Sequence, residues 1–219
     1  MKKALITVEN LTKSYGQTTI LNQVSFELLE GEILVVLGAS GAGKTTLLNI
    51  LSRLERDYEG SVKYAGDIFK DKTVPLPVVF QDFDQLLPWY TVKENILLPF
   101  ERKEFTPEDK EIIDFLGLLE DLQKYPHELS GGMKQRTAIG RSLLSDGCCI
   151  FMDEPFGSLD NQRRQQLQVL ILEINKRYGR TILFITHDIE EARFLAHRIG
   201  EIDSRGRLSI VDKAVYSSS

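Results

Sequence analysis

A glycine-rich segment is the first feature of the sequence whose residue types could do chemistry. Residues 38–45 fit the pattern G-x-x-x-x-G-K-[ST]. In this pattern the glycines let backbone N–H groups converge on phosphate oxygens, Lys44 adds a positive charge and Thr45 can ligate Mg²⁺. An apolar run precedes the segment and a helical pattern follows it. We therefore expect a nucleotide-binding loop here and disfavour a plain glycine-rich turn.

Two carboxylates follow a second apolar run, residues 149–152. Asp153, at the end of a strand beside a phosphate loop, would hold Mg²⁺ directly or through water. Glu154 would then be free to orient and deprotonate the attacking water. The alternative is a solvated acidic turn, which is common for an isolated Asp-Glu pair but less favoured beside a phosphate loop.

A third segment, residues 129–136, has the sequence Leu-Ser-Gly-Gly-Met-Lys-Gln-Arg. Ser130 favours a helix N-cap, so a plain cap is one interpretation. A helix N-terminus also attracts anions, and this one would be a second anion site in a chain that binds one nucleotide. With this segment the chain resembles the ATP-binding cassette (ABC) ATPases, whose signature it matches.

The resemblance to ABC ATPases runs from about residue 6 to residue 208 and includes further motifs of that family in order. It implies that Tyr15 stacks on adenine and that His187 contacts the γ-phosphate. It also implies that Gln81 reaches Mg²⁺ and the attacking water and senses a membrane partner. Residues 158–160 match the loop that crosses between subunits. Taken singly, each of these residues could equally be structural, and His127 and His197 match no catalytic role.

The resemblance further implies a head-to-tail homodimer, in which ATP bound by one chain is covered by the signature segment of the other. The cofactors implied are ATP and Mg²⁺. The implied catalytic residues are Glu154, His187, Gln81 and Lys44, and the implied Mg²⁺ ligands are Thr45, Gln81 and Asp153. The implied nucleotide-binding residues are Tyr15, Gly38, Ser40, Gly41, Ala42, Gly43, Lys44, Thr45, Thr46, Ser130, Gly131 and Gly132.

Two segments favour the importer branch of the family. Residues 154–160 look like the importer form of their loop, and residues 81–95 are similar to the nitrate/sulfonate/taurine importer ATPases. This implies two separate permease subunits and an external solute-binding protein, with the transported solute left open. Trp89 and Tyr90 are either exposed aromatic residues that bind a permease helix or residues that pack within the helical subdomain. The alternative is the ATPase of an exporter or of a lipoprotein-release system, and Gly140 and the short segment 67–77 depart from the usual pattern.

Composition limits the partners of the chain. The 219 residues carry a formal net charge of −5 and are 42% hydrophobic, as in an ordinary globular protein without a bulk field for nucleic acid. No apolar run approaches the roughly 20 residues of a membrane span. Cys148 and Cys149 fit a buried strand better than a metal site. We therefore expect no nucleic-acid partner. Together with the resemblance to ABC ATPases, the missing span implies attachment to the cytoplasmic side of the membrane through a permease.

The elements that must position these residues alternate between strand and helix, which predicts an α/β fold with a mainly parallel sheet. The resemblance specifies a P-loop NTPase (RecA-like) core with an N-terminal antiparallel β subdomain and an inserted α-helical subdomain. The core would comprise residues 1–81 and 147–219, and the helical subdomain residues 82–146. We predict strands at 4–11, 24–29, 33–37, 61–64, 78–80, 149–152 and 181–185, and helices at 44–54, 161–177 and 189–195, with further helix starts at Thr91 and Thr106.

Overall fold

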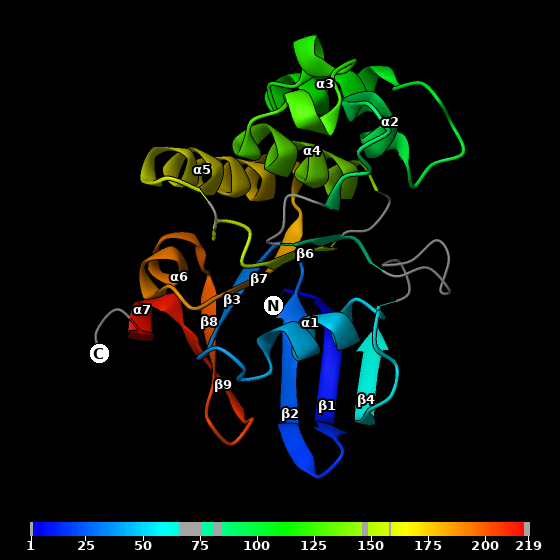
Figure 1. Cartoon of the computed structure of the whole chain (residues 1–219). Helices are drawn as coiled ribbons and strands as arrows, with labels where there is room; N and C mark the ends of the chain where they lie inside the picture. Colours follow the sequence, from blue (N-terminus) through cyan, green and yellow to red (C-terminus); the bar gives the residue numbers. More distant parts are fainter. Residues whose placement is uncertain (1, 66–75, 81–84, 146–148, 158, 217–219) are drawn as a thin grey trace.

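The computed structural model describes residues 2–65, 76–80, 85–145, 149–157 and 159–216 of the chain (Figure 1). Gln81, Cys148 and Ser158, which carry predictions from the sequence, lie outside these described residues. Both boundaries predicted for the helical subdomain also fall in the gaps between them, so that division stays a prediction.

The N-terminal part forms a three-stranded antiparallel sheet in the order β2-β1-β4. Its strands are β1 (Ala4–Tyr15), β2 (Thr18–Leu29) and β4 (Glu59–Tyr64). The first two are longer than predicted, because their polar ends pair across a tight turn in which Tyr15 faces Thr18 and Gly16 has a φ of 60°. The predicted antiparallel β subdomain is therefore present.

A six-stranded sheet forms the centre of the molecule, in the order β5-β6-β7-β3-β8-β9. All its pairings are parallel except the last, between β8 and β9. The mainly parallel sheet is confirmed, whereas β8 and β9 were not predicted. Its strands are β3 (Ile33–Leu37), β5 (Val78–Val79), β6 (Cys149–Asp153), β7 (Thr181–Thr186), β8 (Arg198–Ile202) and β9 (Leu208–Asp212).

Side chains of the central sheet alternate between two cores, because successive residues of a strand point to opposite faces. On β3, Leu34 and Val36 pack with α1 and the antiparallel sheet, while Ile33 and Val35 pack with the remaining helices. Phe151 and Met152 of β6 divide in the same way. The sheet is therefore covered on both faces, as its continuous apolar strands predict.

The helices lie on both sides of this sheet, and α2, α3 and α4 gather at one end of the molecule, far from the three-stranded sheet (Figure 1). The N-caps predicted at Thr91 and Thr106 are both present as capping boxes. The helices are α1 (Lys44–Leu51), α2 (Val92–Leu97), α3 (Pro107–Phe115), α4 (Gly131–Leu144), α5 (Asn161–Tyr178), α6 (Ile189–Leu195) and α7 (Lys213–Tyr216), with 3₁₀ turns at Leu119–Asp121 and Pro126–Glu128.

The helix predicted to reach residue 54 ends at Leu51, so that prediction is wrong at its C-terminal end. Arg53 adopts a left-handed φ of 66°, which a helix cannot continue through, and Leu54 is 51% exposed. The prediction included residue 54 because Leu54 continues the helical spacing of apolar residues. In the structure the Leu54 side chain lies outside the core.

Gly140, which departs from the family pattern, lies where α4 packs closely against its neighbours. A Cβ atom at this position would lie 3.1 Å from Leu116 Cδ1 and 3.4 Å from Ile96 Cδ1. The glycine therefore allows a short approach between helices, at the usual helix cost of about 1 kcal/mol relative to alanine. Within the described part of the chain, no helix is both long enough and apolar enough to cross a membrane.

Candidate active site

The phosphate loop joins β3 to α1, and its conformation requires glycine. Gly43, the N-cap of α1, has a φ of 98°, and a Cβ atom there would lie 2.8 Å from Ile20 Cγ2. Among the described residues no side chain caps α1, and its first turn holds no acidic residue. The free N–H groups and the helix dipole therefore favour an anion at this end.

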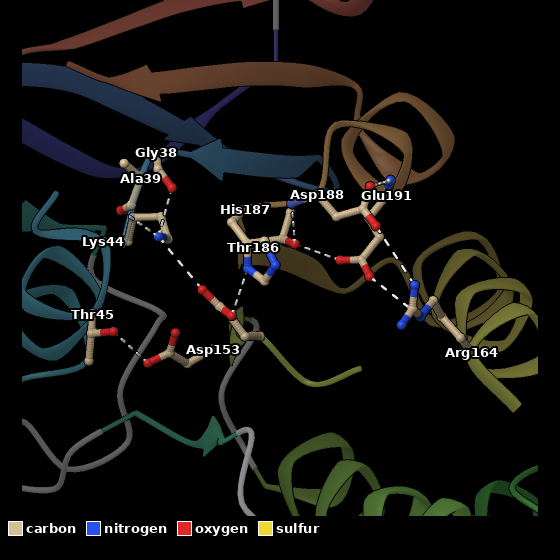
Figure 2. A network of polar contacts seen from close by, with 11 residues as sticks. Gly38, Ala39, Lys44, Thr45, Asp153, Arg164, Thr186, His187, Asp188 and Glu191 are labelled. Atoms are coloured by element: carbon tan, nitrogen blue, oxygen red, sulfur yellow. Dashed lines mark hydrogen bonds and ion pairs between the residues drawn. The ribbon is translucent and has the colours of Figure 1, made fainter. Parts of the chain in front are cut away.

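Lys44 lies at the start of α1 and is buried at 5% exposure. Its Nζ donates hydrogen bonds to the carbonyl oxygens of Gly38 (2.8 Å) and Ala39 (3.0 Å). The same Nζ lies 3.6 Å from Glu154 Oε1 (Figure 2). The cation is thus held by its own loop and points toward the carboxylate at the end of β6.

Thr45 and Asp153 are brought together from positions more than a hundred residues apart. The Thr45 hydroxyl donates to Asp153 Oδ2 at 2.9 Å (Figure 2). Burial raises the pKa of the Asp153 carboxyl, the Thr45 hydrogen bond and the Lys44 charge oppose this, and the Glu154 charge adds to it. Two oxygen ligands of the kind that Mg²⁺ accepts therefore face each other.

Glu154 has an unusual backbone conformation, with a φ of 45° in a residue other than glycine. Its N–H donates to the Ile185 carbonyl oxygen at 3.0 Å, and its Oε2 lies 2.9 Å from His187 Nδ1. Such backbone conformations cost about 1–3 kcal/mol and persist where the surroundings impose them, often at functional sites. The side chain of Glu154 therefore contacts both Lys44 and His187.

The loop that carries His187 is held by a polar network that sequence reasoning missed. Thr186 Oγ1 donates to Glu191 Oε2 at 2.6 Å and accepts from the Asp188 N–H at 3.0 Å. Arg164, on α5, lies 3.7 Å from Asp188 and 3.9 Å from Glu191 (Figure 2). The signal available in the sequence was Asp188, which caps α6 through the N–H groups of residues 190 and 191.

A pocket of about 240 Å³ is bordered by the phosphate loop, Tyr15 and Glu154. Tyr15 stands at its edge, 53% exposed, with Lys13 Nζ 4.8 Å from its ring centroid. A larger hollow of about 590 Å³ beside α2 has mixed charges and no phosphate loop, so it is not the candidate site. The smaller pocket is lined by Tyr15, Ile20, Ser40, Gly41, Gly43, Lys44, Thr45, Thr46 and Glu154.

The signature segment does not join this pocket. Ser130 caps α4, its Oγ accepting from the Met133 N–H at 3.4 Å, and neither it nor Gly131 or Gly132 is among the lining residues. Gly38 and Ala42 belong to the phosphate loop without lining the pocket. The structure therefore unites the predicted loop, carboxylates and His187, and leaves the signature segment apart.

Comparison with known proteins identifies the family. A family model described as "ABC transporter" matches residues 21–157. The chain is 36% identical to the lipoprotein-releasing system ATP-binding protein LolD of Bacteroides fragilis, over 91% of this chain and 98% of that protein. It is 39% identical to the aliphatic sulfonates import ATP-binding protein SsuB of Bacillus thuringiensis, over 86% of this chain and 75% of that protein. It is 39% identical to the bicarbonate transport ATP-binding protein CmpD of Synechocystis, over 90% of this chain and 73% of that protein.

Solved structures agree with this assignment. The fold is similar to that of cbiO1 from Clostridium perfringens, with a TM-score of 0.86 at 23% identity over 100% of this chain and 92% of that one. A dimeric bacterial ABC transporter cassette matches with a TM-score of 0.78 at 31% identity, over 95% and 99%. A structure of that cassette in a post-hydrolysis state, bound to ADP and Pi, matches with a TM-score of 0.75 at 28% identity, over 95% of this chain and 99% of that one. With a phosphate loop facing two carboxylates, and with these relatives, the chain belongs to the ABC transporter family as an ATP-binding subunit of the ABC ATPase type.

Proposed function

We propose that this ABC ATPase powers the import of a small solute through separate permease subunits. The hydrolytic part of the proposal rests on one observation, the pocket in which the phosphate loop, Tyr15 and Glu154 face one another. In it Tyr15 stacks on adenine, while Ser40, Gly41 and the start of α1 hold the phosphates. These groups bind and orient ATP, which is most of what phosphoryl transfer requires.

Mg²⁺ fits the residues present at this site. Thr45 and Asp153 offer a hydroxyl and a carboxylate 2.9 Å apart, and Gln81 is the third proposed ligand. The described residues include no group of three or more His, Cys, Asp or Glu side chains that could hold a metal. Mg²⁺ commonly takes one or two protein oxygens and completes its shell with phosphate and water, so this sparse set suits it. When bound it would neutralise charge on the phosphates.

Glu154 is the proposed general base, with its carboxylate at the pocket and its Oε2 close to His187 Nδ1. In this role it accepts a proton from the attacking water while Lys44 faces the phosphates. His187 is the proposed contact of the γ-phosphate: its side chain is 66% exposed, and in this role it exchanges its contact with Glu154 for one with the phosphate. Gln81 completes the proposed catalytic set.

Two copies of the chain are proposed to bind head to tail around two nucleotides. Ser130, Gly131 and Gly132 lie at the N-terminus of α4 and do not line their own chain's pocket, so they can serve the pocket of a second copy. A dimeric form of a related cassette supports this arrangement.

Glu154→Gln tests the proposed base. We expect ATP binding to persist, hydrolysis to slow by about 10²–10⁴-fold and an ATP-dependent dimer to accumulate, because the amide cannot take a proton. Steady-state phosphate release and light scattering with ATP measure the two effects. Glu120→Gln, an exposed substitution, is the matched control. Normal turnover in the Glu154→Gln variant would remove Glu154 from the base role.

The importer branch is supported by the loop after the carboxylates and by two relatives. Phe156, in the segment that looks like the importer form, is buried at 1% exposure, 5.2 Å from Phe184 between ring centroids. SsuB and CmpD are named for sulfonate import and bicarbonate transport, which suggests a small anionic solute, with an external solute-binding protein. Trp89, 66% exposed, is a proposed permease contact that would hold the chain on the cytoplasmic membrane face.

The second candidate is the ATPase of a lipoprotein-release system, which the match to 98% of LolD favours. Co-purification of the chain with its membrane partners, followed by reconstitution in proteoliposomes, separates the two. An importer shows ATPase activity stimulated by a solute-loaded binding protein and accumulates the solute. Stimulation by a lipoprotein, without solute uptake, would replace the importer proposal by the second candidate.

A further inference from the structure

The side chain of Gln135 occupies a junction between three segments of the molecule. It lies on the second turn of α4, the helix that begins with the signature residues, and its exposure is 0%. Its Nε2 donates to the carbonyl oxygens of Pro155 (2.9 Å) and Phe80 (3.4 Å). Its Oε1 accepts from Gln85 Nε2 at 3.2 Å. A buried amide is therefore satisfied on both sides, by partners from outside its own helix.

The orientation of this amide is defined by its partners. The Pro155 and Phe80 carbonyl oxygens can only accept, so the NH₂ group of Gln135 must face them. Turning the amide over would place Oε1 against two acceptors and the NH₂ group against Gln85 Nε2, at a buried position where unmatched polar groups are costly. Gln135 therefore holds two backbone carbonyls at once.

Both carbonyls belong to segments of the candidate active site. Pro155 directly follows Glu154, whose N–H is held from the other side by the Ile185 carbonyl oxygen at 3.0 Å. Phe80 directly precedes Gln81 in the sequence. The Phe80 N–H donates to Gln85 Oε1 at 3.2 Å, and the Phe80 carbonyl oxygen accepts from Gln85 Nε2 at 2.9 Å. The backbone on either side of Glu154 is thus fixed, by a strand neighbour before it and by Gln135 after it.

We infer that Gln135 is a positioning residue, which makes the placement of Glu154 depend on the position of α4. The inference deepens the proposed function and rests on it. The strained φ of 45° at Glu154 needs support from its surroundings, and the hydrogen bond to Pro155 supplies it. Ser130 of the signature segment is the N-cap of α4. A nucleotide bound at that segment therefore affects, through α4 and Gln135, the backbone next to Glu154.

Gln135→Met is the direct test, because methionine keeps the length of the side chain and removes both donors. We expect kcat to fall by about tenfold to a hundredfold, as for a misplaced catalytic group, with the KM for ATP changed less than about twofold. Thr137→Val is the control: this residue is also fully buried on α4, but its hydroxyl donates only within the helix, to the Met133 carbonyl oxygen at 2.8 Å. It should lower Tm and leave kcat unchanged.

The same substitution in the Glu154→Gln background separates positioning from general stabilisation. If Gln135 acts through Glu154, Gln135→Met causes no further loss of kcat once the base is gone. A second loss of the same size would overturn the inference. Wild-type kcat in Gln135→Met would also overturn the inference. If Glu154→Gln still slows hydrolysis as expected, that result leaves the proposed function intact. Normal hydrolysis by Glu154→Gln alone would instead overturn the proposed base and this inference with it.

A second variant covers the case in which Gln135→Met does not fold. In Gln135→Glu, the protonated acid can still donate to the Pro155 carbonyl oxygen, whereas the ionised form places negative charge against two acceptors. We expect kcat relative to the wild-type chain to fall as pH rises through the pKa of the new carboxyl. Parallel pH profiles for the variant and the wild-type chain would overturn the inference.

Discussion

His197 uses its side chain to extend the hydrogen bonding between β3 and β8. Its Nδ1 accepts from the Ile33 N–H at 2.9 Å, and its own backbone N–H donates to the Ile33 carbonyl oxygen at 2.9 Å. Only a neutral imidazole accepts at Nδ1. Burial lowers the pKa of His197, the Lys2 and Lys213 charges lower it further, and Glu32 opposes them. The role is structural, as expected when no catalytic motif contained this histidine.

This contact makes the free energy of unfolding depend on pH. Because the folded-state pKa of His197 is lowered from 6.5, the unfolded chain binds more protons between the two values. The contribution of the neutral ring is complete above about pH 6.5 and is lost as pH falls toward the folded-state pKa. Urea unfolding between pH 5 and 8 measures it. His197→Gln should flatten the profile, and an unchanged pH dependence in that variant would contradict the expectation.

Lys44→Ala tests the cation of the phosphate loop. Charge-assisted hydrogen bonds contribute about 1.5–3 kcal/mol, so we expect the Kd for ATP to rise roughly tenfold to 150-fold. Isothermal titration with ATP measures the change. Lys63→Ala, which removes a lysine that is 65% exposed, is the matched control. Equal affinities for the Lys44→Ala variant and the wild-type chain would argue against the assignment of this loop.

The phosphate loop and the approach of the acidic pair to it could be predicted from the sequence, whereas the contacts of Gln135 could not. The spacing from Gly38 to Thr45 predicted a phosphate loop, and the acidic pair at the end of β6 predicted the carboxylates that face it. Gln135 lies 20 residues from Pro155 and 55 from Phe80, and nothing local marks an amide that will be buried between them. Its role depends on which segments the fold brings together.

At the scale of elements, α3 begins with a reciprocal cap, of which the sequence predicted only the N-cap residue Thr106. The Thr106 hydroxyl accepts from the Asp109 N–H at 3.2 Å, and Asp109 Oδ2 accepts from the Thr106 N–H at 2.7 Å. Thr106→Ala should lower the free energy of unfolding by about 1 kcal/mol without changing ATPase activity. Urea denaturation measures the loss, and Thr106→Ser should restore most of it. No loss in the alanine variant would mean that solvent replaces the cap.

Helices with a regular apolar stripe were predictable, and the last strands were not. The stripe at 167, 170, 171 and 174 is buried along α5, because helical spacing alone decides which face meets the sheet. Strand β8 contains Arg198, Gly200 and Glu201, so it shows neither an apolar run nor clean alternation. Its strand conformation comes from pairing with β3 and β9, which no local pattern reveals.

At the scale of the whole molecule, one ion pair connects the two sheets. Glu32, between β2 and β3, is 2% exposed and accepts from Arg198 Nε (2.8 Å) and Nη2 (2.7 Å) on β8. Arg198 Nη2 also donates to the Glu27 carbonyl oxygen on β2, at 2.6 Å. The hydrogen bond to Glu32 raises the pKa of Arg198. Residues 166 positions apart are therefore joined at the boundary between the sheets.

Arg198→Met should destabilise the whole chain, because it leaves the Glu32 carboxylate buried without its partner. Removing one member of a buried pair costs about 3–5 kcal/mol, and replacing both members is far less harmful. Denaturant unfolding of Arg198→Met, with and without Glu32→Gln, measures both expectations. The exposed pair of Arg193 and Glu190, 3.1 Å apart, is the control, since Arg193→Met should cost less than about 1 kcal/mol.

Trp89 has a practical consequence for spectroscopy. It is the chain's one tryptophan, it lies just before α2, and it is 66% exposed. All indole fluorescence of the protein therefore originates from a single water-exposed ring beside the helical end of the molecule. Any partner that covers this ring shifts the emission to shorter wavelength, so the protein carries its own optical reporter of docking and needs no added label.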